Sequence, residues 1–350
     1  MNQNATDPAT AEVVERLFFE LRKVIVGQQR VLERMLVCLL ARGHCLLESV
    51  PGLAKTLAVQ TLADTTGGTF ARVQFTPDLL PSDIVGTRIY RSSSESFDVE
   101  LGPIFVNFLL ADEINRAPAK VQSALLEVMA EKQVTIGGRT FLVPQPFLVM
   151  ATQNPIESDG VYQLPEAQRD RFMMKVTLGY PSHDEEIAIV ERMAVSPPIP
   201  EQVVDLATLQ GLQAKTDAVF VDASVIRYAV DVVQATRDPE RHHLSDLTPL
   251  VALGASPRAS LSLVRGAKAL AVLRGRTYAT PQDVFEIAPE VLRHRIVLTY
   301  DALAKDTSVE HVLHRLLSTV PAAWVSPRSP HLPGANGSIS APASTSLFGR

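Results

Sequence analysis

Apolar residues near the N-terminus recur every three or four positions, which is the spacing of one face of an α-helix. This spacing runs from residue 11 to residue 42, with an interruption at Val26-Gly27-Gln28. Short apolar runs follow at 45–47, 73–75, 105–111 and 147–152, and helical patterns lie between them, at 55–64 and 121–129. Short apolar strands that alternate with helices are typical of a mainly parallel sheet covered on both faces. We therefore predict an α/β fold.

Two segments depart from this alternation. Residues 89–99 surround Ser92-Ser93-Ser94, and residues 134–143 surround Gly137-Gly138. Serine and glycine clusters between short strand-like runs are turn signals, so we predict an inserted β-hairpin at each place.

The spacing of apolar residues changes after Tyr180-Pro181-Ser182 and stays helical from 183 to about 320. Ser256-Pro257 and Thr280-Pro281 are helix starts, because serine and threonine cap helices and proline suits the next position. We predict an α/β core over 1–182 and a small all-helical domain over 183–325. Residues 326–350, rich in Ser, Pro, Gly and Ala, are predicted to be disordered.

Composition narrows the class of protein. Hydrophobic residues make up 46% of 350, enough for a large core, and the net charge of −5 argues against a general nucleic-acid binder. We find no apolar run near 18 residues and no signal-peptide pattern, so we expect no membrane insertion. A metal site from Cys38, His44 and Cys45 lacks a zinc spacing. We interpret both cysteines as small apolar residues of a reduced, cytoplasmic protein.

The candidate chemistry begins at Ser49-Val50-Pro51-Gly52-Leu53-Ala54-Lys55-Thr56. This octapeptide resembles a phosphate-binding loop, G-x-x-x-x-G-K-[ST], with Ser49 and Ala54 in place of its glycines. Lys55 would reach the β- and γ-phosphates, Thr56 would ligate Mg²⁺, and the backbone N–H groups of 52–56 would surround the β-phosphate. The alternative is an ordinary loop before an amphipathic helix.

Two further apolar runs end in polar residues. Asp112 and Glu113 follow Leu109-Leu110-Ala111, and Asn154 follows 149–153. Ligands of open α/β sheets lie at the carboxyl ends of the strands. Asp112 could hold Mg²⁺, Glu113 could orient an attacking water, and Asn154 could position that water. The alternatives are an acidic helix cap and a simple Asn-Pro turn.

These stretches resemble the AAA+ ATPases and, within them, the MoxR group. The resemblance runs from about residue 26 to about residue 298. Its most specific stretches are VPGLAKT (50–56), FTPDLLPSDIVGT (75–87), LLADEINRAPAKVQSALLE (109–127), ATQNPIE (151–157), LPEAQRDRF (164–172) and GASPRAS (254–260).

The resemblance implies a P-loop core with a helical lid, the cofactors ATP and Mg²⁺, and roles for individual residues. Gly52, Lys55 and Thr56 match Walker A, and Asp112 and Glu113 match Walker B. The remaining matches are Asn154 with sensor 1, Arg171 with the arginine finger, Arg258 with sensor 2, and Val26, Gly27 and Gln28 with the adenine pocket. The two hairpins match inserts that line or face the central pore of related rings.

Two residues, Ser49 and Arg169, depart from the family pattern. Alanine is tolerated where Ala54 stands, whereas Ser49 replaces a glycine that the family normally keeps. If that position requires positive φ, serine costs on the order of 1–2 kcal/mol; if it requires only close approach to phosphate, serine fits. Arg169 stands where we expect an apolar residue, and either stiffens an interface or is solvated.

Three functions follow as hypotheses. The first is a hexameric ring ATPase that remodels or activates a separate partner, such as a protein with a von Willebrand factor A domain. The second is an ATP-binding scaffold with little or no turnover because of Ser49. The third, a nucleic-acid motor, is disfavoured by the acidic charge balance.

Overall fold

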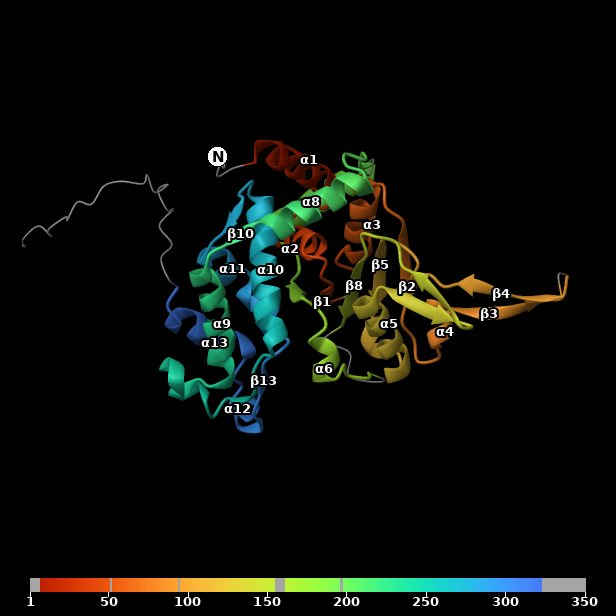
Figure 1. The fold of residues 1–350 in the computed structure, drawn as a ribbon. Coiled ribbons are helices and arrows are strands. Elements are labelled where there is room, and N and C mark those ends of the chain that lie inside the picture. The colour runs from red at the N-terminus through yellow and green to blue at the C-terminus, as the bar shows by residue number, and fades with distance from the viewer. Residues whose placement is uncertain (1–6, 51, 94, 155–160, 196–197, 323–350) are drawn as a thin grey trace, which may run out of the picture.

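Five parallel strands form the central sheet of the computed structural model, which describes residues 7–50, 52–93, 95–154, 161–195 and 198–322 (Figure 1). The strands are β1 (Cys45–Ser49), β2 (Phe70–Gln74), β5 (Phe108–Asp112), β8 (Leu148–Gln153) and β9 (Met174–Leu178), in the order β2-β5-β8-β1-β9. Every neighbouring pair is parallel. All carboxyl ends therefore lie at one edge of the sheet and all amino ends at the other.

Helices cover both faces of this sheet. One face carries α1 (Pro8–Val24), α2 (Gln29–Leu40) and α3 (Lys55–Thr66), and the other carries α4 (Pro81–Val85) and α5 (Ala119–Glu131). Strand side chains alternate between the two cores: Leu110 packs with the first set of helices, and its neighbours Leu109 and Ala111 pack with the second. This alternation is the period of two that a strand buried on both faces requires.

Two hairpins extend from the core. The first pairs β3 (Gly86–Arg91) with β4 (Ser96–Leu101), and the second pairs β6 (Gln133–Ile136) with β7 (Arg139–Leu142). Both predicted hairpins are confirmed, although Ser94 of the first turn lies outside the described residues. The β3–β4 hairpin projects away from the body of the molecule (Figure 1).

The C-terminal half is a lid built mainly of helices. They are α7 (His183–Val195), α8 (Leu206–Ala218), α9 (Ala223–Arg237), α10 (Pro257–Leu273), α11 (Pro281–Leu292), α12 (Tyr300–Ala304) and α13 (Val309–Thr319). Ser256 and Thr280 cap α10 and α11 as the sequence predicts, each with its side-chain oxygen accepting a backbone N–H. The lid helices share one hydrophobic cluster with α2 and β1, so the lid is packed firmly on the sheet core.

Several elements escaped prediction. Strand β9 is one, and the two-stranded pairs β10 (Phe220–Val221) with β12 (Tyr278–Ala279) and β11 (Val251–Leu253) with β13 (Val297–Leu298) are others. Short turns of 3₁₀-helix lie at η1 (Ile114–Arg116), η2 (Glu240–His242) and η3 (Ser245–Leu247), and a single helical turn forms α6 (Glu166–Arg169). The lid is therefore not all-helical.

The domain boundaries at 182 and 325 stay predictions, and the predicted disordered tail, 326–350, lies outside the described residues. Cys38 and Cys45 are buried and unoxidised on α2 and β1, as expected of small apolar residues. No group of His, Cys, Asp and Glu suited to a metal ion occurs among the described residues. Within the same ranges, no helix is long and apolar enough to cross a membrane.

His44 joins three elements at the amino edge of the sheet. Its Nδ1 accepts a hydrogen bond from the Val149 N–H at 3.0 Å, and its Nε2 lies 3.2 Å from the Met129 carbonyl oxygen. One ring nitrogen thus accepts and the other donates, which is the neutral form of the ring. Complete burial lowers the pKa of His44 from 6.5 to about 4, and burial also lowers the pKa of His294 well below 6.5.

We predict that stability falls in acid because of His44. Below pH 6.5 the unfolded chain binds a proton that folded His44 does not bind until about pH 4, so stability present above 6.5 is lost as the pH falls. The loss from this group is on the order of 2 kcal/mol by pH 5. Urea unfolding at pH 7.5 and pH 5 measures it. His44→Gln should flatten this dependence, whereas exposed His314→Gln should leave it unchanged; equal slopes in both variants would contradict the assignment.

Candidate nucleotide site

The candidate phosphate loop joins the carboxyl end of β1 to the first turn of α3, where Lys55 and Thr56 lie half-buried. No ion pair joins Lys55 to another residue of the described ranges. Gly52 has φ +84°, a conformation that glycine adopts without strain. The free N–H groups and dipole of a helix start favour a bound anion. Pro51 lies outside the described residues.

Ser49 does not occupy the strained position of this loop. It ends β1 in register with Leu178, is buried, and is not among the described residues with positive φ. Its Oγ donates to the Val50 carbonyl at 3.2 Å. Ala54 instead has φ 52° and ψ 24°, in the left-handed region. The cost of about 1–2 kcal/mol considered for Ser49 therefore applies to Ala54.

Asp112 and Thr152 face each other across the neighbouring strands β5 and β8. The Thr152 hydroxyl donates to Asp112 Oδ1 at 2.6 Å and accepts the Glu113 N–H at 2.8 Å. The guanidinium of Arg72, on β2, holds the second oxygen of Asp112 at 2.6 Å. Both oxygens of this buried carboxylate are thus fixed in place by hydrogen bonds.

Glu113 leaves β5 with φ 55°, which turns it away from the strand direction. Its Oε2 accepts from Gln74 Nε2 at 2.9 Å and pairs with Arg116 Nε at 2.8 Å. The two acids therefore have separate partners, although they are adjacent in the chain. The partners of Asp112 lie on the strands β8 and β2. Glu113 is held by Gln74, at the end of β2, and by Arg116, which follows β5.

The predicted neighbours of this site lie at the same edge. Asn154 directly follows β8, which stands between β5 and β1, and its side chain is buried. Gln28 donates from Nε2 to the Leu53 carbonyl at 3.4 Å, which brings the predicted adenine segment against the phosphate loop. Gly27, with φ +65°, faces the Glu185 side chain so closely that a Cβ there would lie 2.4 Å from Oε1.

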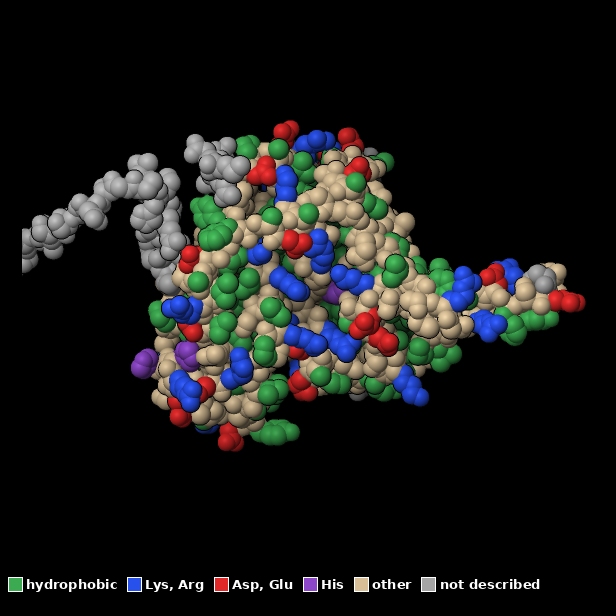
Figure 2. All heavy atoms as spheres, in the orientation of Figure 1, with side chains coloured by type: hydrophobic (Ala, Val, Ile, Leu, Met, Phe, Trp, Pro, Cys, Tyr) green, Lys and Arg blue, Asp and Glu red, His purple; other side chains and the backbone are tan. Residues whose placement is uncertain are grey.

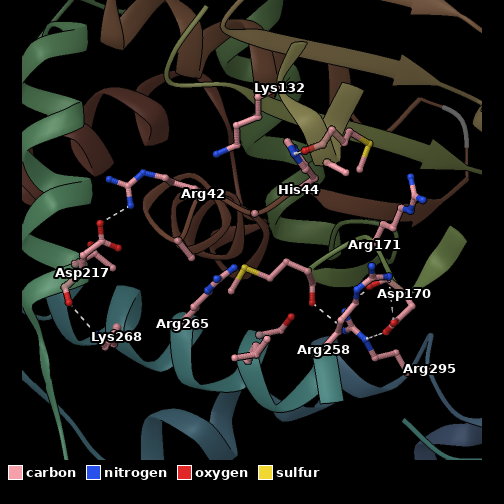
Figure 3. Close-up of a pocket in the computed structure, with 18 residues that line it drawn as sticks. Arg42, His44, Lys132, Asp170, Arg171, Asp217, Arg258, Arg265, Lys268 and Arg295 are labelled. Atoms are coloured by element: carbon pink, nitrogen blue, oxygen red, sulfur yellow. Dashed lines mark hydrogen bonds and ion pairs between the residues drawn. The ribbon is translucent and has the colours of Figure 1, made fainter. Parts of the chain in front are cut away.

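Arg171 and Arg258 lie elsewhere. They line a cavity of about 500 Å³ that also borders Gly43 and His44, just before β1 begins (Figure 3). This cavity is at the amino edge of the sheet, and the phosphate loop is at the carboxyl edge. Arg171 donates to the Leu126 carbonyl at 2.9 Å, and Arg258 lies 3.6 Å from Asp170. The structure brings the two arginines together and separates both from Lys55.

Asp170 anchors the lid beside Arg171. It accepts from buried Arg295 Nε at 2.7 Å and from the cap residue of α10, Ser256, at 2.8 Å. Arg169 is half-buried and lies 3.5 Å from Glu166. This ion pair lies within one helical turn, and the role of Arg169 as an interface residue stays a hypothesis.

Four residues of the acidic site were missed from the sequence: Arg72, Gln74, Arg116 and Thr152. Arg72 and Gln74 are alternate residues of β2, so both point to the same side of the sheet. That alternation could be seen in the sequence, but the partners of the two residues, Asp112 and Glu113, lie about 40 positions away at the end of β5. Thr152 was missed because it lies within an otherwise apolar strand, which gives no sign of a polar role.

Known proteins resemble this chain closely. Residues 44–174 match the ATPase family associated with various cellular activities (AAA), and residues 245–316 match the AAA lid domain. The chain is 60% identical over 312 residues to Chaperone MoxR1 of Mycobacterium tuberculosis, a match that covers 89% of this chain and 83% of that protein. The chain belongs to the MoxR group of AAA+ ATPases.

Other MoxR-type relatives agree with this assignment. Protein MoxR of Paracoccus denitrificans is 33% identical over 80% of this chain and 87% of its own length. A crystal structure of a candidate ATPase from Cytophaga hutchinsonii superposes with a TM-score of 0.86, at 44% identity, covering 91% of this chain and 97% of that one. The two chains therefore share the α/β core with a lid.

We predict opposite stability effects for glycine at the two unusual loop positions. Ala54→Gly should stabilise by about 0.5–1 kcal/mol, because relief of left-handed strain exceeds the entropy that glycine adds to the unfolded chain. Ser49→Gly should destabilise by about 1 kcal/mol, because a strand residue gains that entropy and loses buried contacts. Chemical unfolding of each variant measures both. Stabilisation by Ser49→Gly would show that the strain lies there instead.

Proposed function

We propose that this MoxR-type protein binds and hydrolyses ATP with Mg²⁺. One observation carries the proposal: Lys55, Thr56, Asp112, Glu113 and Asn154 all lie at the carboxyl edge of one parallel sheet. Ligands of open α/β sheets bind at that edge. A free helix start with an unpaired lysine fits a polyphosphate, and a buried carboxylate at the same edge fits a hard cation.

Each residue has a proposed task. The phosphates are held by Lys55 and by the N–H groups of 52–56, and the chain enters this loop through Ser49, Val50 and Pro51. The base is bordered by Val26, Gly27 and Gln28. Thr56 and Asp112 would hold Mg²⁺, which neutralises phosphate charge when bound. Glu113 orients the attacking water with help from Asn154. Arg72 is paired with Asp112, so its guanidinium would compete with the cation for that carboxylate.

We further propose that Arg171 and Arg258 serve the nucleotide of another copy. Both lie at the edge of the sheet opposite to their own loop. Guanidinium groups suit the charge that develops on a transferring phosphoryl group. A chain that carries the loop on one edge and these cations on the other fits a head-to-tail ring. A hexamer is the ring size that the family resemblance implies.

The proposed cellular role is that of a chaperone-like remodeller in the cytoplasm. The name of the relative Chaperone MoxR1 supports it, as do the exposed apolar side chains Tyr90, Phe97 and Leu142 on the two hairpins. A separate partner, such as a protein with a von Willebrand factor A domain, is proposed from the family resemblance. Nucleic acid is not expected as a partner. An ATP-binding scaffold is the alternative, but the unstrained Ser49 removes its main physical reason.

We predict that hydrolysis requires two copies. Specific activity should rise with protein concentration and fall about 100-fold or more in Arg171→Ala and Arg258→Ala. Mixing Arg171→Ala with Glu113→Gln should restore activity, because one variant supplies intact acids and the other supplies intact arginines. Steady phosphate release measures this. Restoration would be missing if each chain served its own nucleotide, and retained ATP binding without turnover in the wild type would favour the scaffold.

Thr152 should act as a positioning residue. Thr152→Val keeps the shape of the side chain but removes the hydroxyl that holds Asp112 and the Glu113 N–H. We expect kcat to fall about tenfold or more while the KM for ATP changes little, because a 1 Å misplacement is costly for chemistry. Thr152→Ser retains the hydroxyl and should recover most of kcat. Equal losses in both variants would indicate a packing role only.

A further inference from the structure

The cavity at the amino edge of the sheet contains more cations than Arg171 and Arg258. Figure 3 shows a second group on its far side, formed by Arg42 after α2, Lys132 after α5, and Arg265 and Lys268 on α10. Lys and Arg side chains gather around a hollow between the lid and the sheet core (Figure 2). The tasks proposed above use none of this second group.

The charge of the cavity is one-sided. Seven Lys and Arg side chains line it, against two Asp. Both aspartates are already paired, Asp170 with Arg295 and Asp217 with Arg42 at 2.6 Å. The protein as a whole has a net charge of −5, so this concentration of positive charge is local. Within the described ranges, Lys132 and Arg265 form no ion pair.

Two members of the second group, Arg42 and Lys132, are held in conformations that cost free energy. Arg42 and Lys132 follow helix ends with φ 52° and 55°, where glycine or asparagine is usual. Burial, together with the charges of Arg42 and Arg265, lowers the pKa of Lys132. Strained backbone and repelling charges that converge on one cavity are characteristic of binding sites.

We propose that Arg42, Lys132 and Arg265 form a binding site for an oligophosphate group. An oligophosphate carries several charges within a few bonds, whereas a carboxylate brings only one charge. Arginine forks bind phosphate oxygens in pairs, and lysine adds a point charge. The volume of about 500 Å³ lies within the range of small-molecule sites and is unlike a flat protein-docking surface. The source of the group is either the nucleotide of a neighbouring copy, which rests on the proposed function, or a free oligophosphate.

The first experiment measures tripolyphosphate binding by calorimetry. The full-length chain carries Lys55→Ala, so that its own phosphate loop is weakened. In this background Lys132→Gln/Arg265→Gln should weaken binding about tenfold or more, because two charge-assisted contacts are lost. The control, Arg241→Gln/Lys305→Gln, changes the net charge equally at exposed positions and should bind as the parent does. Thermal unfolding verifies that each variant is folded.

Two results would overturn the proposal: no tripolyphosphate binding in the Lys55→Ala background, or equal binding by the cavity variant and the control. ATP binding by the wild type, compared with Lys55→Ala, tests the nucleotide loop separately. A failure of the proposed function is thereby distinguished from a failure of this site.

The second experiment identifies the source. ATP hydrolysis is measured for Lys132→Gln/Arg265→Gln with an intact loop, alone and mixed with Glu113→Gln. Lowered hydrolysis that recovers on mixing assigns the site to the nucleotide of a neighbouring copy, because Glu113→Gln chains supply the missing cations. Unchanged hydrolysis together with lost tripolyphosphate binding assigns it to a free oligophosphate. Both results support the site itself.

Discussion

The common direction of the five sheet strands is the constraint on which the rest of the structure depends. It places the carboxylates, the phosphate loop and a free helix start at one edge, and the converging arginines and lysines at the other. A strand of five residues spans roughly 16 Å, so the sheet keeps the two sets of charges apart. One chain thus carries the phosphate loop with its carboxylates on one edge and a cluster of cations on the other, and this separation is the basis of the proposed head-to-tail assembly.

The ion pair between Asp170 and Arg295 ties the sheet core to the helical lid. Arg295 is buried and donates to Asp170 as well as to the carbonyls of Phe172 and Met173. Burial lowers the pKa of Arg295, and Asp170 opposes that effect. Removing either partner would leave a buried charge uncompensated, which is strongly destabilising. The segment that carries Arg171 is consequently bound to the lid helices that carry Arg258, and the two arginines are positioned together.

Much of the core was predictable because its signals are local. The apolar runs of β1, β5 and β8, the hairpin turns, and the caps Ser256 and Thr280 each depend on neighbouring residues. Strand β9 was missed because Lys175 interrupts a short apolar run. The two-residue strands of the lid have no periodicity to detect. Arg72 and the cavity cations Arg42, Lys132 and Arg265 were beyond sequence reasoning, because each is defined by neighbours from distant segments.

Backbone conformation adds information that motif matching lacks. Eight non-glycine residues have positive φ within the described ranges, and five of them belong to the regions discussed: Gln28, Arg42, Ala54, Glu113 and Lys132. Ser49, the most unusual residue of the loop in sequence terms, is absent from that set. A motif position that departs from its family is therefore a poor guide to strain, since the conformation decides the cost. The same reasoning gives weight to Arg42 and Lys132, which belong to no motif but share the backbone conformation found at Ala54 and Glu113.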